Sequence, residues 1–164
     1  MYFSMEYLYA PWREKYILGK KKGCSLCEYA RDPSRDEENL VVYRGEHNFI
    51  VMNAFPYNVG HVVVAPYRHV SSLEDLRDEE RNEMFSLVSE FIKRMKRLDT
   101  PPQGFNVGIN LGKAAGAGLD THLHVHIVPR WQGDTNFMTT TAETRVISLD
   151  LKKYYKLLRG MFNR

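Results

Sequence analysis

Residues 122–128 form the stretch His122-Leu123-His124-Val125-His126-Ile127-Val128, in which imidazole and aliphatic side chains alternate. An alternation with a period of two is typical of a β-strand, whose successive side chains point to opposite faces. Because each strand residue adds about 3.3 Å, we expect the three rings to share one face at spacings of about 7 Å. Three of the chain's six histidines stand in this stretch, which indicates chemistry rather than packing.

Two kinds of chemistry use such a row of histidines. A zinc hydrolase arranges imidazoles around a metal ion and leaves one coordination position open for water. Alternatively, one neutral imidazole attacks phosphorus as a nucleophile, while its neighbours fix its tautomer and neutralise the phosphate charge. The preceding residues 112–118 favour the second kind, because the backbone N–H groups of small residues can approach a polyphosphate closely. The candidates for these contacts are Gly116, Ala117 and Gly118.

Length and composition fit a single soluble domain. The chain has 164 residues, of which 43% are hydrophobic, enough to bury a real core. Its formal charge of +3 arises from 23 basic and 20 acidic residues, a balance that argues against a protein that coats nucleic acid. The longest apolar run, near residues 62–66, is too short to span a bilayer, and the start lacks a secretory pattern. We therefore expect a cytoplasmic protein with neither a membrane nor a nucleic-acid partner.

The chain has two cysteines, Cys24 and Cys27, which form a C-x-x-C pair. In a chain without a secretion signal, such a pair indicates metal ligation or redox chemistry rather than a structural disulfide.

The remaining patterns predict an α+β fold with a mainly antiparallel sheet, one long helix and a C-terminal helix. The long helix begins near Asp78 and carries an apolar stripe from Met84 to Met95, and the second helix covers residues 148–162. Polar residues 32–39 and the basic residues 19–27 are expected to be loops. Strands are expected at residues 40–43, 48–52, 61–65, 105–110 and 123–128.

Residues 122–128 resemble the signature of the histidine triad (HIT) family of nucleotide hydrolases and transferases. This signature is His-φ-His-φ-His-φ-φ, where φ is an apolar residue. Further agreement comes from Asn53, from Gly60-His61-Val62-Val63-Val64-Ala65-Pro66, from His69 and from Pro129-Arg130. Three further stretches resemble the bacterial branch of diadenosine tetraphosphate phosphorylases and related hydrolases. They are Ala10-Pro11-Trp12-Arg13, Asn110-Leu111-Gly112 and Pro129-Arg130-Trp131-Gln132-Gly133-Asp134-Thr135-Asn136-Phe137.

The resemblance implies a HIT-like fold and roles for particular residues. His124 would be the nucleophile that attacks an α-phosphorus and forms a nucleotidyl-histidine, with His126 and His61 binding phosphate oxygens or assisting the leaving group. Asn53 matches a ribose-binding position, Asn110 a position beside the phosphates, and Val51 and Val63 the apolar slot for the base. We expect one HIT domain over residues 1–164, with an N-terminal arm (1–38), a core (39–130) and a C-terminal extension (131–164).

The resemblance also implies cofactors and an assembly. Family members with an N-terminal C-x-x-C use the equivalents of His69 and His122 as further zinc ligands. Cys24, Cys27, His69 and His122 would then form a closed, structural site. Mg²⁺ bound with the nucleotide is a second candidate cofactor, and a homodimer through the long helix and the adjoining sheet edge is expected.

One departure from the family pattern leaves the reaction open. The phosphorylase branch carries a Gly-Ser pair before the triad, whereas no serine stands in residues 116–121 of this chain. The acceptor of the nucleotidyl group is therefore either water, in a hydrolase, or inorganic phosphate, in a phosphorylase. Two alternatives are a zinc hydrolase with the metal on the triad histidines and a nucleotide-binding module without turnover.

Overall fold

The computed structural model of the protein describes residues 23–134 and 150–162. Several sequence expectations lie outside these described residues, namely the motif at residues 10–13, the lysines at 20–22, residues 135–137 and the first two residues of the expected C-terminal helix. None of the helices in the described ranges is long and apolar enough to cross a membrane.

The centre of the fold is a five-stranded sheet in the order β1-β2-β3-β5-β4, in which every neighbouring pair is antiparallel. This confirms the predicted α+β class and antiparallel sheet, and each strand lies within a few residues of its expected place. The strands are β1 (Val41–Arg44), β2 (Asn48–Met52), β3 (Val62–Pro66), β4 (Gly104–Gly108) and β5 (Val125–Arg130).

Both faces of the central strands are covered, which explains why β2 and β3 are apolar without alternation. Side chains such as Ile50 and Val64 point into the larger core cluster on one face. Their neighbours Val51 and Val63 join a smaller cluster with Leu26 on the opposite face.

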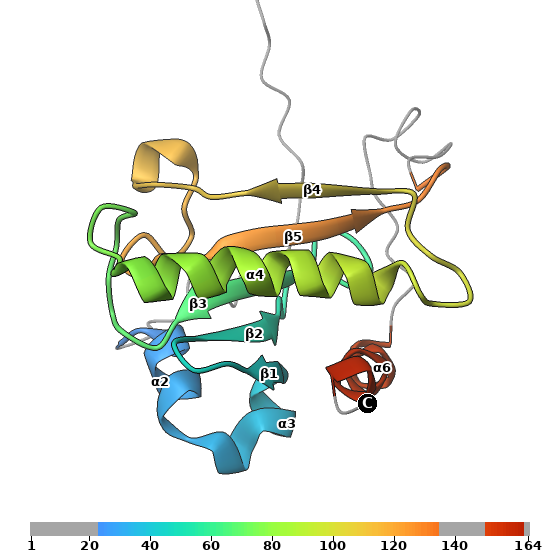
Figure 1. The fold of residues 1–164 in the computed structure, drawn as a ribbon, viewed down its shortest axis with the longest axis horizontal. Helices are drawn as coiled ribbons and strands as arrows, with labels where there is room; N and C mark the ends of the chain where they lie inside the picture. Colours follow the sequence, from blue (N-terminus) through green and yellow to red (C-terminus); the bar gives the residue numbers. More distant parts are fainter. Residues whose placement is uncertain (1–22, 135–149, 163–164) are drawn as a thin grey trace, which may run out of the picture.

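Two helices cover the face with the larger cluster: α4 (Asp78–Met95) and α6 (Leu151–Phe162). Figure 1 shows α4 running across the sheet, with α6 beside it at the β1 end. The apolar stripe of α4 packs on the chain's own sheet, since Met84, Phe91 and Met95 are fully buried. The stripe is therefore used within the chain, and the expected homodimer stays a prediction.

The expectation of loops before the first strand was wrong. Helix α2 (Ser25–Arg31), the short 3₁₀ helix η2 (Pro33–Arg35) and α3 (Asp36–Asn39) occupy this part of the chain. Local capping explains them, because Cys24 Sγ accepts a hydrogen bond from the Cys27 N–H at the start of α2. The Asp32 carboxylate accepts in the same way from Ser34 N–H.

Arg44 at the end of β1 fastens these helices to the sheet. Its guanidinium donates to the Asp36 carboxylate at 2.7 Å and to the backbone oxygens of Tyr29 and Ala30 at 2.6 and 3.2 Å. The two carbonyl contacts lie near the C-terminal end of α2, where a cation is favourable to the helix dipole. Arg44 therefore fixes one end of α2, whose other end carries Cys24.

We expect Arg44→Leu to lower the free energy of unfolding by about 2–3 kcal/mol, because it leaves the largely buried Asp36 carboxylate without its cation. The side chains of this pair are only 19% and 12% exposed. Arg35→Leu is the matched control, because it removes an ion pair of the same type from the same segment whose side chains are 55% and 65% exposed. Urea unfolding of both variants measures the difference, and equal losses would contradict this assignment.

Candidate functional site

The strand expected at residues 123–128 begins two residues later than predicted, although Leu123, Val125 and Ile127 all join the larger core cluster, as the alternation predicts. Strand β5 begins only at Val125, so His122 and His124 precede it. The Leu123 N–H donates to the Val70 carbonyl at 2.6 Å, which holds this segment against the residues after β3 instead. The rings of His124 and His126 lie closer than the expected spacing of about 7 Å, with centroids 4.8 Å apart, and His122 Nδ1 lies 3.2 Å from Cys24 Sγ.

A backbone carbonyl fixes the proton of His124. The Nδ1 atom of this ring lies 2.8 Å from the His122 carbonyl oxygen, which can only accept a hydrogen bond. Nδ1 therefore carries the hydrogen, and Nε2 keeps its lone pair. The ring lines a cavity, so His124 presents a neutral, nucleophilic nitrogen to it.

A backbone amide fixes the opposite arrangement for His61 and His126. The Tyr57 N–H donates to His61 Nδ1 at 3.0 Å, so the His61 hydrogen resides on Nε2. This Nε2 lies 3.0 Å from His126 Nδ1, which must therefore accept, leaving the His126 hydrogen on its own Nε2. The Tyr57 amide, the His61 ring and the His126 ring are linked by these hydrogen bonds, and we call them the donor chain. It ends in an N–H donor beside the lone pair of His124.

Burial keeps these rings uncharged. His61 has no exposed surface, and burial lowers its pKa to about 3, with His126 and His124 adding repulsion. Burial and the neighbouring His124 lower the pKa of His126 to about 4. The pKa of His124 is also lowered, mainly by burial. At neutral pH the tautomers deduced above are therefore the relevant states.

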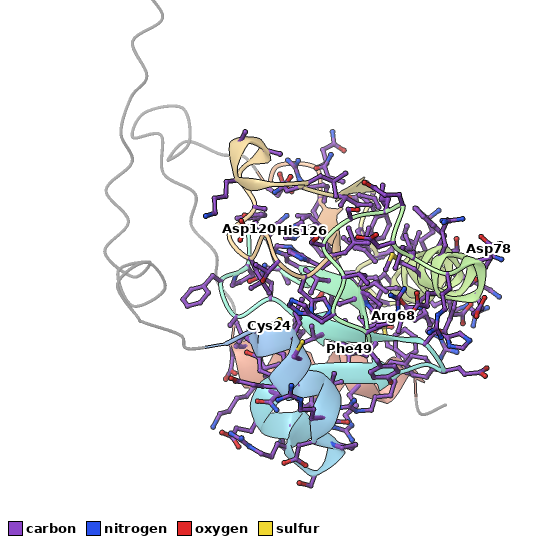
Figure 2. The ribbon with its side chains drawn as sticks, turned by 90° about the vertical axis from the view of Figure 1, so that its left-hand side faces the viewer. Cys24, Phe49, Arg68, Asp78, Asp120 and His126 are labelled. Carbon is purple, nitrogen blue, oxygen red and sulfur yellow. The ribbon has the colours of Figure 1, made fainter. Side chains whose placement is uncertain are left out.

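The cavity beside His124 and His126 gathers most of the residues that the sequence singled out. Figure 2 shows His126 at the same end of the molecule as Cys24 and Asp120, far from Asp78 on α4. Ala117 is not part of the cavity wall, and His61 lies behind His126 rather than on the wall. The predicted residues that line the cavity are Val51, Asn53, Val63, Asn110, Gly116, Gly118, His124 and His126.

One wall of this cavity was not predicted from the sequence. Ser25, Leu26 and Tyr29 contribute to it from α2, and Glu38 and Asn39 from α3. Residues 19–27 and 32–39 were expected to be loops, so nothing indicated that side chains from this part of the chain would meet the sheet. Leu26 and Tyr29 lie three residues apart, and a single pair at this spacing is too short a pattern to signal a buried helix face.

The metal-ligand candidates also come together. One ligand atom from each of Cys24, Cys27, His69 and His122 lies within 4.8 Å of all the others. His122 Nδ1 lies 3.2 and 3.4 Å from the two sulfur atoms, and His69 Nδ1 lies 3.2 Å from Cys27 Sγ. Ligands at the usual zinc distances are about 3.6 Å apart in a tetrahedron, so this set fits the ion.

The surroundings of the cluster orient its ligands. His122 Nε2 donates to the Pro66 carbonyl at 2.9 Å, so its Nδ1 lone pair faces the thiols, as in metal-binding histidines generally. Arg68, next to His69, is held by the buried Glu80 at 2.7 Å. Burial and the neighbouring Cys24 raise the pKa of the Cys27 thiol to about 11, which a bound cation would reverse.

A family model describing the HIT domain matches residues 34–133, which include the triad and the cavity residues outside α2. The chain belongs to the HIT family. Among curated HIT relatives, an AP-4-A phosphorylase of Mycobacterium tuberculosis is 50% identical over 123 residues, which cover 75% of this chain and 63% of that protein. An uncharacterised HIT-like protein of Methanocaldococcus jannaschii is 30% identical over 135 residues, covering 82% of this chain and all of that protein. The chain thus spans less than two thirds of the length of the phosphorylase.

Solved HIT structures agree with the fold. A zinc-bound histidine triad family protein from Mycobacterium smegmatis superposes with a TM-score of 0.69 at 27% identity, covering 86% of this chain and 94% of that one. This neighbour binds zinc, and the Cys24, Cys27, His69 and His122 cluster supplies a ligand set suited to the same ion here.

We expect the rings of His61 and His126 to stay neutral at pH 5, with protonation midpoints near 3 and 4. Since the unfolded chain takes up these protons below pH 6.5, stability should fall by about 1–2 kcal/mol per ring between pH 7 and pH 5. NMR titration of the ring Cε1–H resonances measures the midpoints directly. Midpoints near 6.5 would show that burial does not control these rings.

Proposed function

We propose that this chain is an enzyme that cleaves dinucleoside polyphosphates at an α-phosphate, with diadenosine tetraphosphate (Ap4A) as its substrate. One observation carries the proposal: the rings of His124 and His126 line the same cavity with centroids 4.8 Å apart, and their contacts leave a lone pair on His124 Nε2 and a hydrogen on His126 Nε2. Transfer of a nucleotidyl group requires a nucleophile that attacks the α-phosphorus and a donor that hydrogen-bonds to the phosphate oxygens. The 50% identity to an AP-4-A phosphorylase supports this choice of substrate.

The first step follows from the two tautomers. His124 Nε2 attacks the α-phosphorus, an N–P bond forms, and the P–O bond to the polyphosphate breaks, so that ATP leaves Ap4A. The His122 carbonyl stabilises the positive charge that develops on the attacking ring by accepting its Nδ1–H. His126 Nε2–H donates to a phosphate oxygen, which stabilises the transition state.

The remaining cavity residues would bind the nucleotide. Asn53 Oδ1 accepts from Phe55 N–H at 2.9 Å, which fixes this side chain and leaves its NH₂ group to meet a ribose oxygen. Val51 and Val63 would contact the base, and Asn110, Gly116 and Gly118 the phosphates. Among the described residues, the cavity wall contains no lysine or arginine, so Mg²⁺ bound to the polyphosphate would supply the missing counter-charge.

In the second step an acceptor attacks the nucleotidyl-His124. Water would release AMP, and inorganic phosphate would release ADP. The relative named as a phosphorylase favours phosphate, although residues 116–121 lack the serine of that branch. We therefore propose phosphorolysis as the main reaction, with the loop amides near Gly116 and Gly118 holding the incoming phosphate.

We also propose a structural zinc ion on Cys24, Cys27, His69 and His122. When bound, it would link the start of α2 to the triad segment without an open position for substrate. The arrangement does not supply the three converging imidazoles of the alternative zinc hydrolase, because only His122 of the triad belongs to the described metal-competent cluster. We further propose that the chain forms a single HIT domain, that it assembles as a homodimer and that it is located in the cytoplasm.

The product test uses Ap4A with and without inorganic phosphate. A phosphorylase gives ADP and ATP only when phosphate is present, whereas a hydrolase gives AMP and ATP in both samples. No cleavage in either sample would favour the binding module without turnover.

We expect His124→Ala to lower kcat at least about 1,000-fold, because it removes the nucleophile and the covalent route. His47→Ala is the control, since His47 is a histidine away from the cavity and should retain full activity. Circular dichroism checks that both variants fold. Activity of the His124 variant within tenfold of the parent would exclude His124 as the nucleophile.

We expect the purified protein to contain one zinc ion per chain and Cys24→Ser to lose most of it, because a closed four-ligand site loses one strong ligand. The melting temperature should fall by roughly 5–10 °C, since α2 loses its link to the triad segment. Elemental analysis and thermal melts of the variant measure both effects, with His47→Ala again as control. An unchanged zinc content would exclude the proposed ligand set.

A further inference from the structure

A polar network outside the cavity joins the end of β5 to the turn that precedes β3. Arg130, the last residue of β5, donates to the Asp134 carboxylate through Nε at 2.7 Å and Nη2 at 2.9 Å. The Asp134 side chain is only 9% exposed, and it also accepts from the Trp131 N–H at 3.2 Å. The function proposed above assigns no role to this network.

Asn58 connects the network to the turn. Its side chain is buried, and its Nδ2 donates both to the Asp134 carboxylate at 2.8 Å and to the Pro129 carbonyl at 2.9 Å. Asparagine is suited to this place, because its NH₂ group carries two hydrogens for two acceptors. A carboxylate here would face two acceptors and be repelled.

The same turn forms two hydrogen bonds with His61. The backbone oxygen of Asn58 accepts from the His61 N–H at 3.2 Å, and the preceding Tyr57 N–H donates to His61 Nδ1 at 3.0 Å. Gly60 closes the turn with a φ of +72°, and a Cβ there would lie only 3.1 Å from the Tyr154 ring. The position of the Tyr57 amide therefore depends on how Asn58 is held.

We propose that Asn58 and Asp134 are positioning residues of the catalytic site, which set the tautomers of His61 and His126 by holding the Tyr57 amide against His61 Nδ1. The catalytic part of this inference rests on the proposed function, whereas the tautomers can be measured without any substrate.

The consequence of losing the Tyr57 contact follows from the donor chain. A His61 ring that is free to carry its hydrogen on Nδ1 offers a lone pair at Nε2. His126 would then donate from Nδ1, and its own Nε2 would face the cavity as a lone pair instead of an N–H. The shape of the cavity stays the same, but the donor beside His124 is lost. Turnover should therefore suffer more than binding.

The test compares Asn58→Leu and Asp134→Ala with a matched control, Asn106→Ala. Leucine keeps the branched shape and the number of side-chain heavy atoms of asparagine but cannot donate, and the Asp134 variant leaves Asn58 with the Pro129 carbonyl alone. Asn106 also accepts from Arg130, at 2.8 Å, but it does not contact Asn58, so its loss should leave His61 unaffected. Long-range ¹H–¹⁵N NMR spectra report which nitrogen of each ring carries the hydrogen.

In the parent protein and in Asn106→Ala we expect Nε2–H tautomers for His61 and His126. In Asn58→Leu both rings should become tautomer mixtures, with a smaller change in Asp134→Ala, and kcat for Ap4A should fall about tenfold or more while KM changes less than about threefold. Backbone amide spectra check folding. If Asn58→Leu does not fold, Asp134→Ala decides the question.

Unchanged tautomers in the folded variants would overturn the proposal, whatever their activity. Altered tautomers in Asn106→Ala would also overturn it, because the effect would not pass through Asn58. If the parent protein did not cleave Ap4A, the proposed function would fail, while the NMR result would still decide how the histidines are held.

Discussion

The site depends on two backbone groups that bond to imidazole nitrogens. The His122 carbonyl holds the hydrogen of His124 on Nδ1, and the Tyr57 amide holds that of His61 on Nε2. A carbonyl accepts a hydrogen bond and an amide N–H donates one, so the two groups impose opposite tautomers. His124 therefore offers a lone pair on Nε2, whereas the donor chain ends in the Nε2–H of His126. Burial lowers the pKa of all three rings, so protonation does not erase this difference at neutral pH.

His122 links this arrangement to the metal-ligand cluster. Its carbonyl orients His124, while its ring lies against Cys24 and Cys27. Cys24 caps α2 and Cys27 lies in its first turn, and this helix supplies one wall of the cavity through Leu26 and Tyr29. Arg44 holds the far end of the same helix. A cation on the cluster would therefore stabilise both the nucleophile and part of the nucleotide pocket, although it lies outside the reaction itself.

Much of this could be predicted from the sequence, because the decisive signals are local. The triad and the stripe on α4 follow from short periodic patterns, and β2 and β3 follow from short apolar runs. The helices α2 and α3 could not be predicted, since they are short and depend on capping by Cys24 and on the distant Arg44. The start of the triad strand was predicted two residues too early, since β5 begins at Val125, and the preceding Leu123 N–H bonds to the Val70 carbonyl, a contact that no local pattern encodes. The tautomers depend in the same way on pairs distant in sequence, such as His61 and His126.

The central claim is that His124 becomes covalently bonded to the nucleotide. Its most direct measurement is mass spectrometry of the protein mixed with Ap4A, quenched within milliseconds at alkaline pH, where phosphoramidate bonds survive, and then digested. The account predicts an added AMP group on the peptide that contains His124, appearing before product release and absent from His124→Ala. Turnover with no adduct, or an adduct on another residue, would contradict it.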